Sequence, residues 1–203
     1  MAHQVVVKNI AKTEFVLGLA ALLVDTIGAE GFQHVQEKLA ELWVALETMR
    51  GLLRAAEADA AADEYGVVRP AWNPLDAARN LYPRLYPRMI EIVQQLGASG
   101  LVAMPTEQDL KGPLADDIRR YYQAARADAF ERIPLFKLAW DVALSAFAGR
   151  QVLYERFFFG DPVRMAGALV ASYDRDPYKA RVSALLADDE LAIEMLHAEP
   201  VEP

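Results

Sequence analysis

Cysteine is absent from the 203 residues, and its absence excludes several kinds of chemistry. Disulfides, thiolate zinc sites, cysteine-ligated iron–sulfur clusters and cysteine nucleophiles all require it. Histidine is scarce, with three in the chain. A di-iron site in a helical bundle needs Glu-x-x-His on two helices, and only Glu194 to His197 has this spacing. We therefore expect no metal site.

Positive charge and long apolar runs are also in short supply. Lys and Arg number 21 against 29 Asp and Glu, for a net charge of −8, which disfavours nucleic acid and anionic lipid as partners. The longest apolar run, residues 15–24, is about half of what a membrane span needs. No basic segment of a secretory signal precedes it. We expect a soluble, cytoplasmic, globular protein.

Apolar residues recur at intervals of three and four in two long segments, residues 6–24 and 32–53. This spacing predicts two amphipathic helices. Gly28 and Gly31 lie between them and favour a sharp reversal, so the pair is expected to form an antiparallel hairpin. Continued through the alanine-rich stretch to Tyr65, the second helix would be about 50 Å long.

Prolines in the middle of the chain predict where helices begin or are interrupted. Asn73, followed by a proline, is typical of a residue that caps the start of a shorter helix. Pro83 and Pro87 predict interruptions before a helix at 89–96. Residues 97–113 contain three glycines and two prolines and are predicted to form a loop.

The C-terminal half is again helical in pattern. Residues 114–158 are predicted to form a helix with a break or kink at Pro134. Asp161 is a plausible N-cap for a further helix over 162–173. Residues 183–203 are acidic and are expected to form a short peripheral helix and a tail. One stripe of the long segment is apolar: Ile133, Phe136, Trp140, Leu144 and Phe147.

These patterns predict an all-α fold, an antiparallel four-helix bundle with short peripheral helices and no strand. The helical bundle domain is expected to span residues 1–182, followed by the acidic segment 183–203.

The segment 149–165 contains the densest group of residues suited to binding a ligand. It sets three consecutive phenylalanines, 157–159, against a turn at Gly160 and the start of a helix, with Arg156 and Arg164 on either side. A helix N-terminus attracts anions and aromatic rings pack against flat ring systems, so a phosphorylated heteroaromatic ligand such as a flavin nucleotide would suit both.

A plainer interpretation of this segment remains open. The phenylalanines would then lie in the core of an ordinary helical corner, with the arginines paired to Glu155 and Asp161. The chain contains no Gly-x-Ser-x-Gly or Ser-x-x-Lys motif and no Walker or dinucleotide-binding loop. It therefore offers no self-contained active site.

Four stretches carry a resemblance to a known family: AGRQVLYER at 148–156, FGDPVR at 159–164, HQVVVKN at 3–9 and FKLAWD at 136–141. Over residues 3–181 the chain closely resembles the C-terminal helical domain of the 4-hydroxyphenylacetate 3-monooxygenase oxygenase component family. That domain is similar to the four-helix bundle that closes acyl-CoA dehydrogenases.

The resemblance implies a homotetrameric flavoprotein that receives reduced FAD from a separate flavin reductase and hydroxylates a phenol next to its existing hydroxyl group. Family members carry two upstream domains that this sequence lacks, and those domains hold the groups that orient the phenol. The resemblance therefore implies no catalytic residue here. We expect the isolated chain to self-associate but to be inactive unless the upstream portion is supplied, for example as a separate chain.

What the resemblance does assign is a cofactor cradle. Gln4 resembles the glutamine by which related dehydrogenases touch FAD across a subunit boundary. The segment that lies against the flavin nucleotide in the family corresponds to Arg156, Phe157, Phe158, Phe159, Gly160 and Asp161.

Two other functions remain as alternatives. One is a non-catalytic helical assembly module. The other is a fragment similar to acyl-CoA dehydrogenases, in which Glu155 would abstract a substrate proton. We favour a structural ion pair between Glu155 and Arg156 over that catalytic role.

Overall fold

The computed structural model describes residues 1–187. The chain divides into two compact units, residues 1–166 and 167–203. The predicted domain boundary between residues 182 and 183 falls within the last described helix. Most of the segment beyond it lies outside the described residues, so that division stays a prediction.

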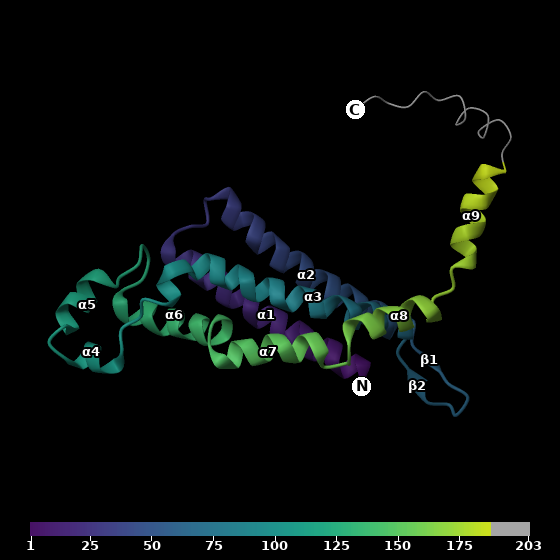
Figure 1. Ribbon diagram of the computed structural model, residues 1–203, viewed down its shortest axis with the longest axis horizontal. Coiled ribbons are helices and arrows are strands. Elements are labelled where there is room, and N and C mark those ends of the chain that lie inside the picture. The colour runs from purple at the N-terminus through teal and green to yellow at the C-terminus, as the bar shows by residue number, and fades with distance from the viewer. Residues whose placement is uncertain (188–203) are drawn as a thin grey trace, which may run out of the picture. The chain divides into compact units, whose positions relative to one another are not determined.

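Helices make up nearly all of the regular structure in the described residues, which confirms the all-α fold (Figure 1). In chain order the elements are α1 (Ala2–Ile27), α2 (Gln33–Ala58), β1 (Ala61–Ala62), β2 (Val68–Arg69), α3 (Trp72–Gly97), the 3₁₀ helix η1 (Ala98–Leu101), α4 (Glu107–Lys111), α5 (Ala115–Tyr121), α6 (Ala129–Ala143), α7 (Ala146–Phe157), α8 (Pro162–Ser172) and α9 (Asp176–Leu186).

The bundle is built from three long helices and a fourth rod made of two shorter ones. Helices α1, α2 and α3 pack against one another, and α6 and α7 run along α3 (Figure 1). The core between them is aliphatic and aromatic, and its largest fully buried side chains include Leu23, Leu42, Met49, Tyr82 and Phe136. None of the helices in the described part of the chain is long and apolar enough to cross a membrane.

The first helical hairpin forms as predicted. Helix α1 ends at Ile27 because Gly28 takes a left-handed conformation, with φ of +67°, that other residues adopt at a cost. The Gly28 and Ala29 N–H groups donate to carbonyls in the last turn of α1.

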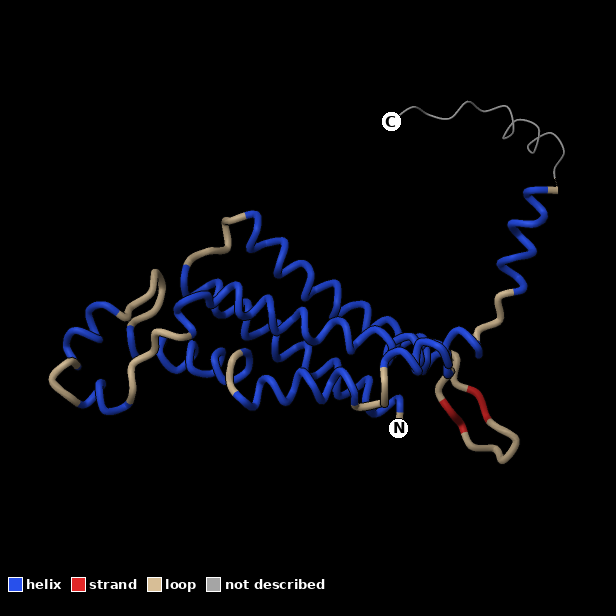
Figure 2. Tube along the Cα trace, in the orientation of Figure 1, coloured by secondary structure: helices blue, strands red, loops and turns tan. Residues whose placement is uncertain are grey.

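The predicted extension of the second helix to Tyr65 is wrong. Helix α2 ends at Ala58, and a short antiparallel hairpin, β1–β2, follows it (Figure 2). The Asp63 carboxylate accepts hydrogen bonds from the N–H groups of Tyr65 and Val67, both at 2.9 Å, and Gly66 has a φ of +75°. These local turn contacts outweigh the helix preference of the alanines, and they also correct the prediction that the chain has no strand.

The predicted interruptions at Pro83 and Pro87 are also wrong. Helix α3 runs unbroken through both prolines, and it begins at Trp72, so Asn73 is not its cap. A proline inside a helix costs about 3 kcal/mol. Pro83 is buried, and its neighbours Tyr82 and Tyr86 lie in the core, so burial of this face offsets that cost.

The long predicted helix over 114–158 divides into three, α5, α6 and α7. The breaks fall at 122–128 and 144–145, and Pro134 lies inside α6. Asp128 and Ser145 cap α6 and α7 with their side chains, which explains where the helices restart. The predicted loop 97–113 contains η1 and the one-turn helix α4.

The predicted apolar stripe over this segment is buried only in its first part. Ile133 and Phe136 lie in the core, whereas Trp140, Leu144 and Phe147 are each more than 40% exposed. The chain breaks at 144–145 between α6 and α7, so the five residues do not form one continuous helical face.

Candidate functional site

The corner between α7 and α8 is the segment 156–161, here called the aromatic corner. Helix α7 ends at Phe157, and the Gly160 N–H donates to the Phe157 carbonyl at 2.9 Å. Gly160 has a φ of +118°, a backbone conformation that residues other than glycine rarely adopt. The Asp161 carboxylate accepts from the Val163 N–H at 3.0 Å, which confirms the predicted cap of α8.

The aromatic corner faces solvent rather than the core. Phe157 is 48% exposed and Phe158 is 40% exposed, while Phe159 is partly buried. The ring centroids of Phe158 and Tyr154 lie 5.0 Å apart. A surface hollow of about 330 Å³ is lined by Arg150, Leu153, Tyr154, Phe157 and Phe158. The plainer interpretation, with all three phenylalanines in the core, is therefore wrong.

Arg156 and Arg164, on either side of the three phenylalanines, do not form the predicted ion pairs. Arg156 and Arg164 are exposed, and among the described residues neither lies within ion-pair distance of Glu155 or Asp161. The start of α8 is a weaker anion site than predicted, because the Asp161 carboxylate occupies it and Pro162 has no N–H. The positive charge at this corner therefore comes from the arginine side chains.

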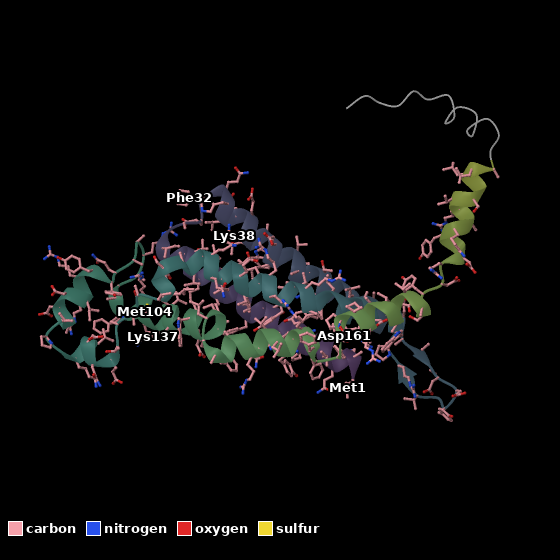
Figure 3. The ribbon with its side chains drawn as sticks, viewed as in Figure 1. Met1, Phe32, Lys38, Met104, Lys137 and Asp161 are labelled. Atoms are coloured by element: carbon pink, nitrogen blue, oxygen red, sulfur yellow. The ribbon has the colours of Figure 1, made fainter. Side chains whose placement is uncertain are left out.

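Gln4 lies in the first turn of α1 with an exposed side chain. Its neighbour Val5 borders a small void together with Phe158 and Phe159, so the start of α1 and the aromatic corner share one end of the bundle. Met1 and Asp161 are labelled at that end in Figure 3. Gln4 therefore lies at the end of the bundle that carries the aromatic corner.

Glu155 is a buried anchor and not a free base. Its side chain is 2% exposed, and both carboxylate oxygens lie 2.7 Å from the Lys8 ammonium. The Lys12 ammonium lies 2.5 Å from Oε1 and donates to the Gln151 amide oxygen at 2.9 Å. The expected ion pair exists, but its partners are lysines of α1 and not Arg156.

Aromatic rings surround this ion pair, which we call the Lys–Glu–Lys bridge. The Lys8 ammonium lies 5.2 Å from the Tyr154 ring centroid and 5.6 Å from that of Phe158. The Lys12 ammonium lies 5.1 Å from the ring centroid of Tyr86. Burial lowers the pKa of Lys8 from its ordinary value, and the hydrogen bond to Glu155 offsets only part of that effect. The bridge therefore fixes α7 and its aromatic end against α1.

Sequence reasoning missed Arg79 of α3. Its guanidinium carbon lies 4.9 Å from the ring centroid of Phe159 and 5.3 Å from that of Trp72. Such stacking stabilises an arginine whose charge is partly desolvated. A spacing of seven places Trp72 and Arg79 on one face of a helix, and a spacing of four does the same for Lys8 and Lys12. These spacings are the signals that could have pointed to both clusters.

The described residues also bear on two other kinds of site, a metal centre and further hollows. Among the described residues no group of three or more acidic or histidine side chains could hold a metal ion. The Glu194 to His197 spacing lies outside the described residues. A hollow of about 570 Å³ lies between the chain near Met104 and the α6 residues Lys137 and Trp140, and it contains none of the predicted site residues (Figure 3).

Comparison with known proteins identifies relatives of the whole described chain. A curated relative, the oxygenase component of 4-hydroxyphenylacetate 3-monooxygenase from Thermus thermophilus, is 52% identical over 198 residues, covering 98% of this chain and 41% of that protein. A crystal structure of such an oxygenase component, complexed with FAD and 4-hydroxyphenylacetate, has a TM-score of 0.89 and 51% identity, covering 97% of this chain and 41% of that one.

The fold extends to a more distant protein. An archaeal 4-hydroxybutyryl-CoA dehydratase from N. maritimus superimposes with a TM-score of 0.76 at 16% identity, which shows a shared fold alone. This chain spans about two-fifths of the length of the oxygenase components it matches. Residues 1–187 match the protein family described as 4-hydroxyphenylacetate 3-hydroxylase C terminal. The chain therefore belongs to that family and corresponds to the C-terminal part of the oxygenase components that it matches.

Proposed function

We propose that this chain forms the C-terminal part of a two-component hydroxylase that uses reduced FAD to hydroxylate phenols of the 4-hydroxyphenylacetate type. In this proposal the aromatic corner contributes part of the FAD site. The observation that carries it is an open corner of exposed aromatic rings between two arginines that form no ion pair within residues 1–187. A related oxygenase component that is 51% identical to this chain holds FAD and 4-hydroxyphenylacetate.

The residues at the corner fit a flavin nucleotide in charge and shape. Arg156 and Arg164 are exposed donors that could pair with the pyrophosphate. Phe157 and Phe158 present apolar surface against a ring system and exclude water from it. Gly160, with no Cβ, lets the backbone of the turn approach a ligand closely. Bound reduced FAD would supply the activation of oxygen, which none of these side chains can provide.

Gln4 is placed to add a polar contact near the same cofactor. Its amide is exposed and unpaired among the described residues, at the end of the bundle that carries the corner. The proposal leaves proton transfer and substrate orientation to the upstream domains and the supply of reduced FAD to a flavin reductase. The burial and pairing of Glu155 disfavour the alternative in which it abstracts a proton as a free base.

We expect hydroxylase activity only when this chain is combined with the upstream domains of an oxygenase component. The chain alone, given reduced FAD, oxygen and 4-hydroxyphenylacetate, should show no turnover. Adding the upstream domains of an oxygenase component as a second chain, together with a flavin reductase, should restore it. Arg156→Ala should then weaken FAD binding by roughly 10- to 150-fold, since a charge-assisted hydrogen bond contributes about 1.5–3 kcal/mol. Product formation and FAD fluorescence titration measure the two effects.

Arg120→Ala is the matched control, because Arg120 is an exposed arginine of α5 outside the corner. It should leave FAD affinity and turnover unchanged. If Arg156→Ala behaves like Arg120→Ala, the corner is not part of the FAD site. Turnover by the chain alone, or none after complementation with properly folded upstream domains, would count against the proposed division of labour.

We also propose that the bundle takes part in an oligomer. Trp43 and Val44 of α2 are 54% and 66% exposed, and adjacent exposed apolar side chains mark association surfaces. Sedimentation velocity over a concentration series should show self-association of the chain. Replacing both residues with lysine should shift the distribution toward the monomer.

The control for self-association is Val102→Lys, which changes an apolar side chain that is 74% exposed on the loop after η1. It should leave the distribution unchanged. A chain that sediments as a monomer at all concentrations would contradict the proposed assembly role.

A further inference from the structure

A continuous row of planar side chains joins the aromatic corner to the first turn of α3. Ring centroids lie 5.0 Å apart for Tyr154 and Phe158 and 5.1 Å apart for Phe158 and Phe159. The Arg79 guanidinium carbon then lies 4.9 Å from the Phe159 ring centroid and 5.3 Å from that of Trp72. We call these five side chains the stacked row. The row begins at the hollow that Tyr154 and Phe158 line, and it ends at Trp72.

Trp72, at the far end of the stacked row, is open to solvent. Its exposed fraction is 49%. A single exposed tryptophan is not unusual, but this indole is also held in place by the guanidinium that lies over it. The Arg79 side chain is itself only 18% exposed, and it is fixed against Phe159 and beside the Asp76 carboxylate, at 3.4 Å. A ring that is both fixed and exposed needs little further ordering when a flat ligand stacks on it.

The hollow at the corner is small for FAD. Its volume of about 330 Å³ is near the lower end of the range for sites of drug-sized ligands, roughly 300–1,000 Å³. FAD is larger than most such ligands, and it has two flat ring systems, isoalloxazine and adenine, joined through a pyrophosphate. If Phe157 and Phe158 contact the isoalloxazine, as proposed above, the adenine lies outside the hollow. The stacked row connects that hollow to a second exposed aromatic ring.

We propose that Trp72 stacks against the adenine of FAD. This inference rests on the proposed FAD site at the aromatic corner and adds a residue of α3 to it. Adenine is a flat and uncharged ring that an indole recognises through its π face, without hydrogen-bonding partners. Trp72 therefore favours FAD over a flavin nucleotide that has no adenine.

A comparison of FAD with FMN tests this assignment, because FMN has the same flavin ring but no adenine. This chain, combined with the upstream domains of an oxygenase component, is titrated with each cofactor, and isothermal titration calorimetry gives both dissociation constants. Trp72→Leu should weaken FAD binding by roughly 5- to 150-fold, the range for stacking of one base on an aromatic side chain. It should leave FMN binding unchanged. Trp72→Phe keeps an aromatic ring and should lose less FAD affinity than Trp72→Leu.

Trp140→Leu is the matched control, because Trp140 is a tryptophan of α6 that is 43% exposed and lies outside the stacked row. It should change the affinity for neither cofactor. An equal loss of FAD and FMN affinity in Trp72→Leu would overturn the proposal, since it would indicate contact with the flavin half or a general change at the corner. Unchanged FAD affinity in Trp72→Leu would also overturn it.

Arg156→Ala separates this inference from the function on which it rests. If Arg156→Ala weakens FAD binding and Trp72→Leu does not, the corner is part of the FAD site and Trp72 is not. If neither variant weakens FAD binding, the proposed FAD site and the role of Trp72 both fail.

Discussion

Glu155→Gln should lower the free energy of unfolding by about 3 kcal/mol at pH 7. The substitution keeps the shape of the side chain and removes its charge. Two lysine ammonium groups, whose side chains are 34% and 23% exposed, would then face each other without a counter-charge. Because both lysines keep some contact with water, the loss should fall at the low end of the range for breaking a buried ion pair.

The measurement is urea unfolding of the single and double variants. Adding Lys8→Met to Glu155→Gln should recover part of the lost stability, because one of the two uncompensated charges is gone. Glu107→Gln is the control, since it breaks an exposed pair with Lys111 and should cost less than about 0.5 kcal/mol. A loss below 1 kcal/mol for Glu155→Gln would show that the bridge does not hold α7 to α1.

The folded chain should lose stability steeply above pH 10, by up to about 2.7 kcal/mol per pH unit. Two buried tyrosines are responsible. Burial raises the pKa of Tyr86 to about 12 and raises the pKa of Tyr82 still further, and the nearby Glu155 carboxylate adds to both effects. A hydrogen bond with the Thr13 side chain offsets part of the rise in the pKa of Tyr82.

The sign follows from proton binding in the two states. In the unfolded chain both tyrosines lose their protons near the ordinary pKa of 10, whereas in the folded chain they keep them. Between pH 10 and 12 the folded state therefore binds more protons, and stability falls as the pH rises. The lowered pKa of Lys8 acts in the opposite direction, but only below the ordinary lysine pKa of 10.5.

Unfolding free energies measured by denaturant titration at pH 9, 10, 11 and 11.5 test this prediction. Tyr82→Phe should roughly halve the slope above pH 10. Tyr65→Phe removes a tyrosine that is 78% exposed and should leave the slope unchanged. A flat profile in the wild-type chain would contradict the assigned burial of these phenols.

Local signals in the sequence predicted the parts of the fold that local interactions decide. One example is the recurrence of apolar residues every three or four positions in α1. Another is Gly28, because a glycine in the left-handed conformation ends a helix. The continuity of α3 through Pro83 and Pro87 could not be predicted this way. Its stability comes from packing against α1 and α2, and the proline rule describes a helix without such neighbours.

The candidate site divides in the same manner. Composition and spacing located the aromatic corner, the glycine turn and the cap at Asp161, all of which lie within a few residues of each other. The partners of Glu155 could not be found from its neighbours in sequence. An adjacent arginine was the obvious candidate, yet the carboxylate pairs with Lys8, 147 residues away. Only the tertiary fold decides which opposite charges meet in the interior.

That separation has a consequence for the order in which the chain folds. Helices α1, α2 and α3 all lie within residues 2–97, so their contacts close shorter loops than the Lys8 to Glu155 contact and can form earlier. The Lys8 to Glu155 contact closes a loop of most of the chain, and its entropy cost is met only after the intervening helices have docked. We expect the end of α7 to be the last part of the bundle to acquire its native structure, so a nascent or partly unfolded chain would lack the aromatic corner while its first three helices are already in place.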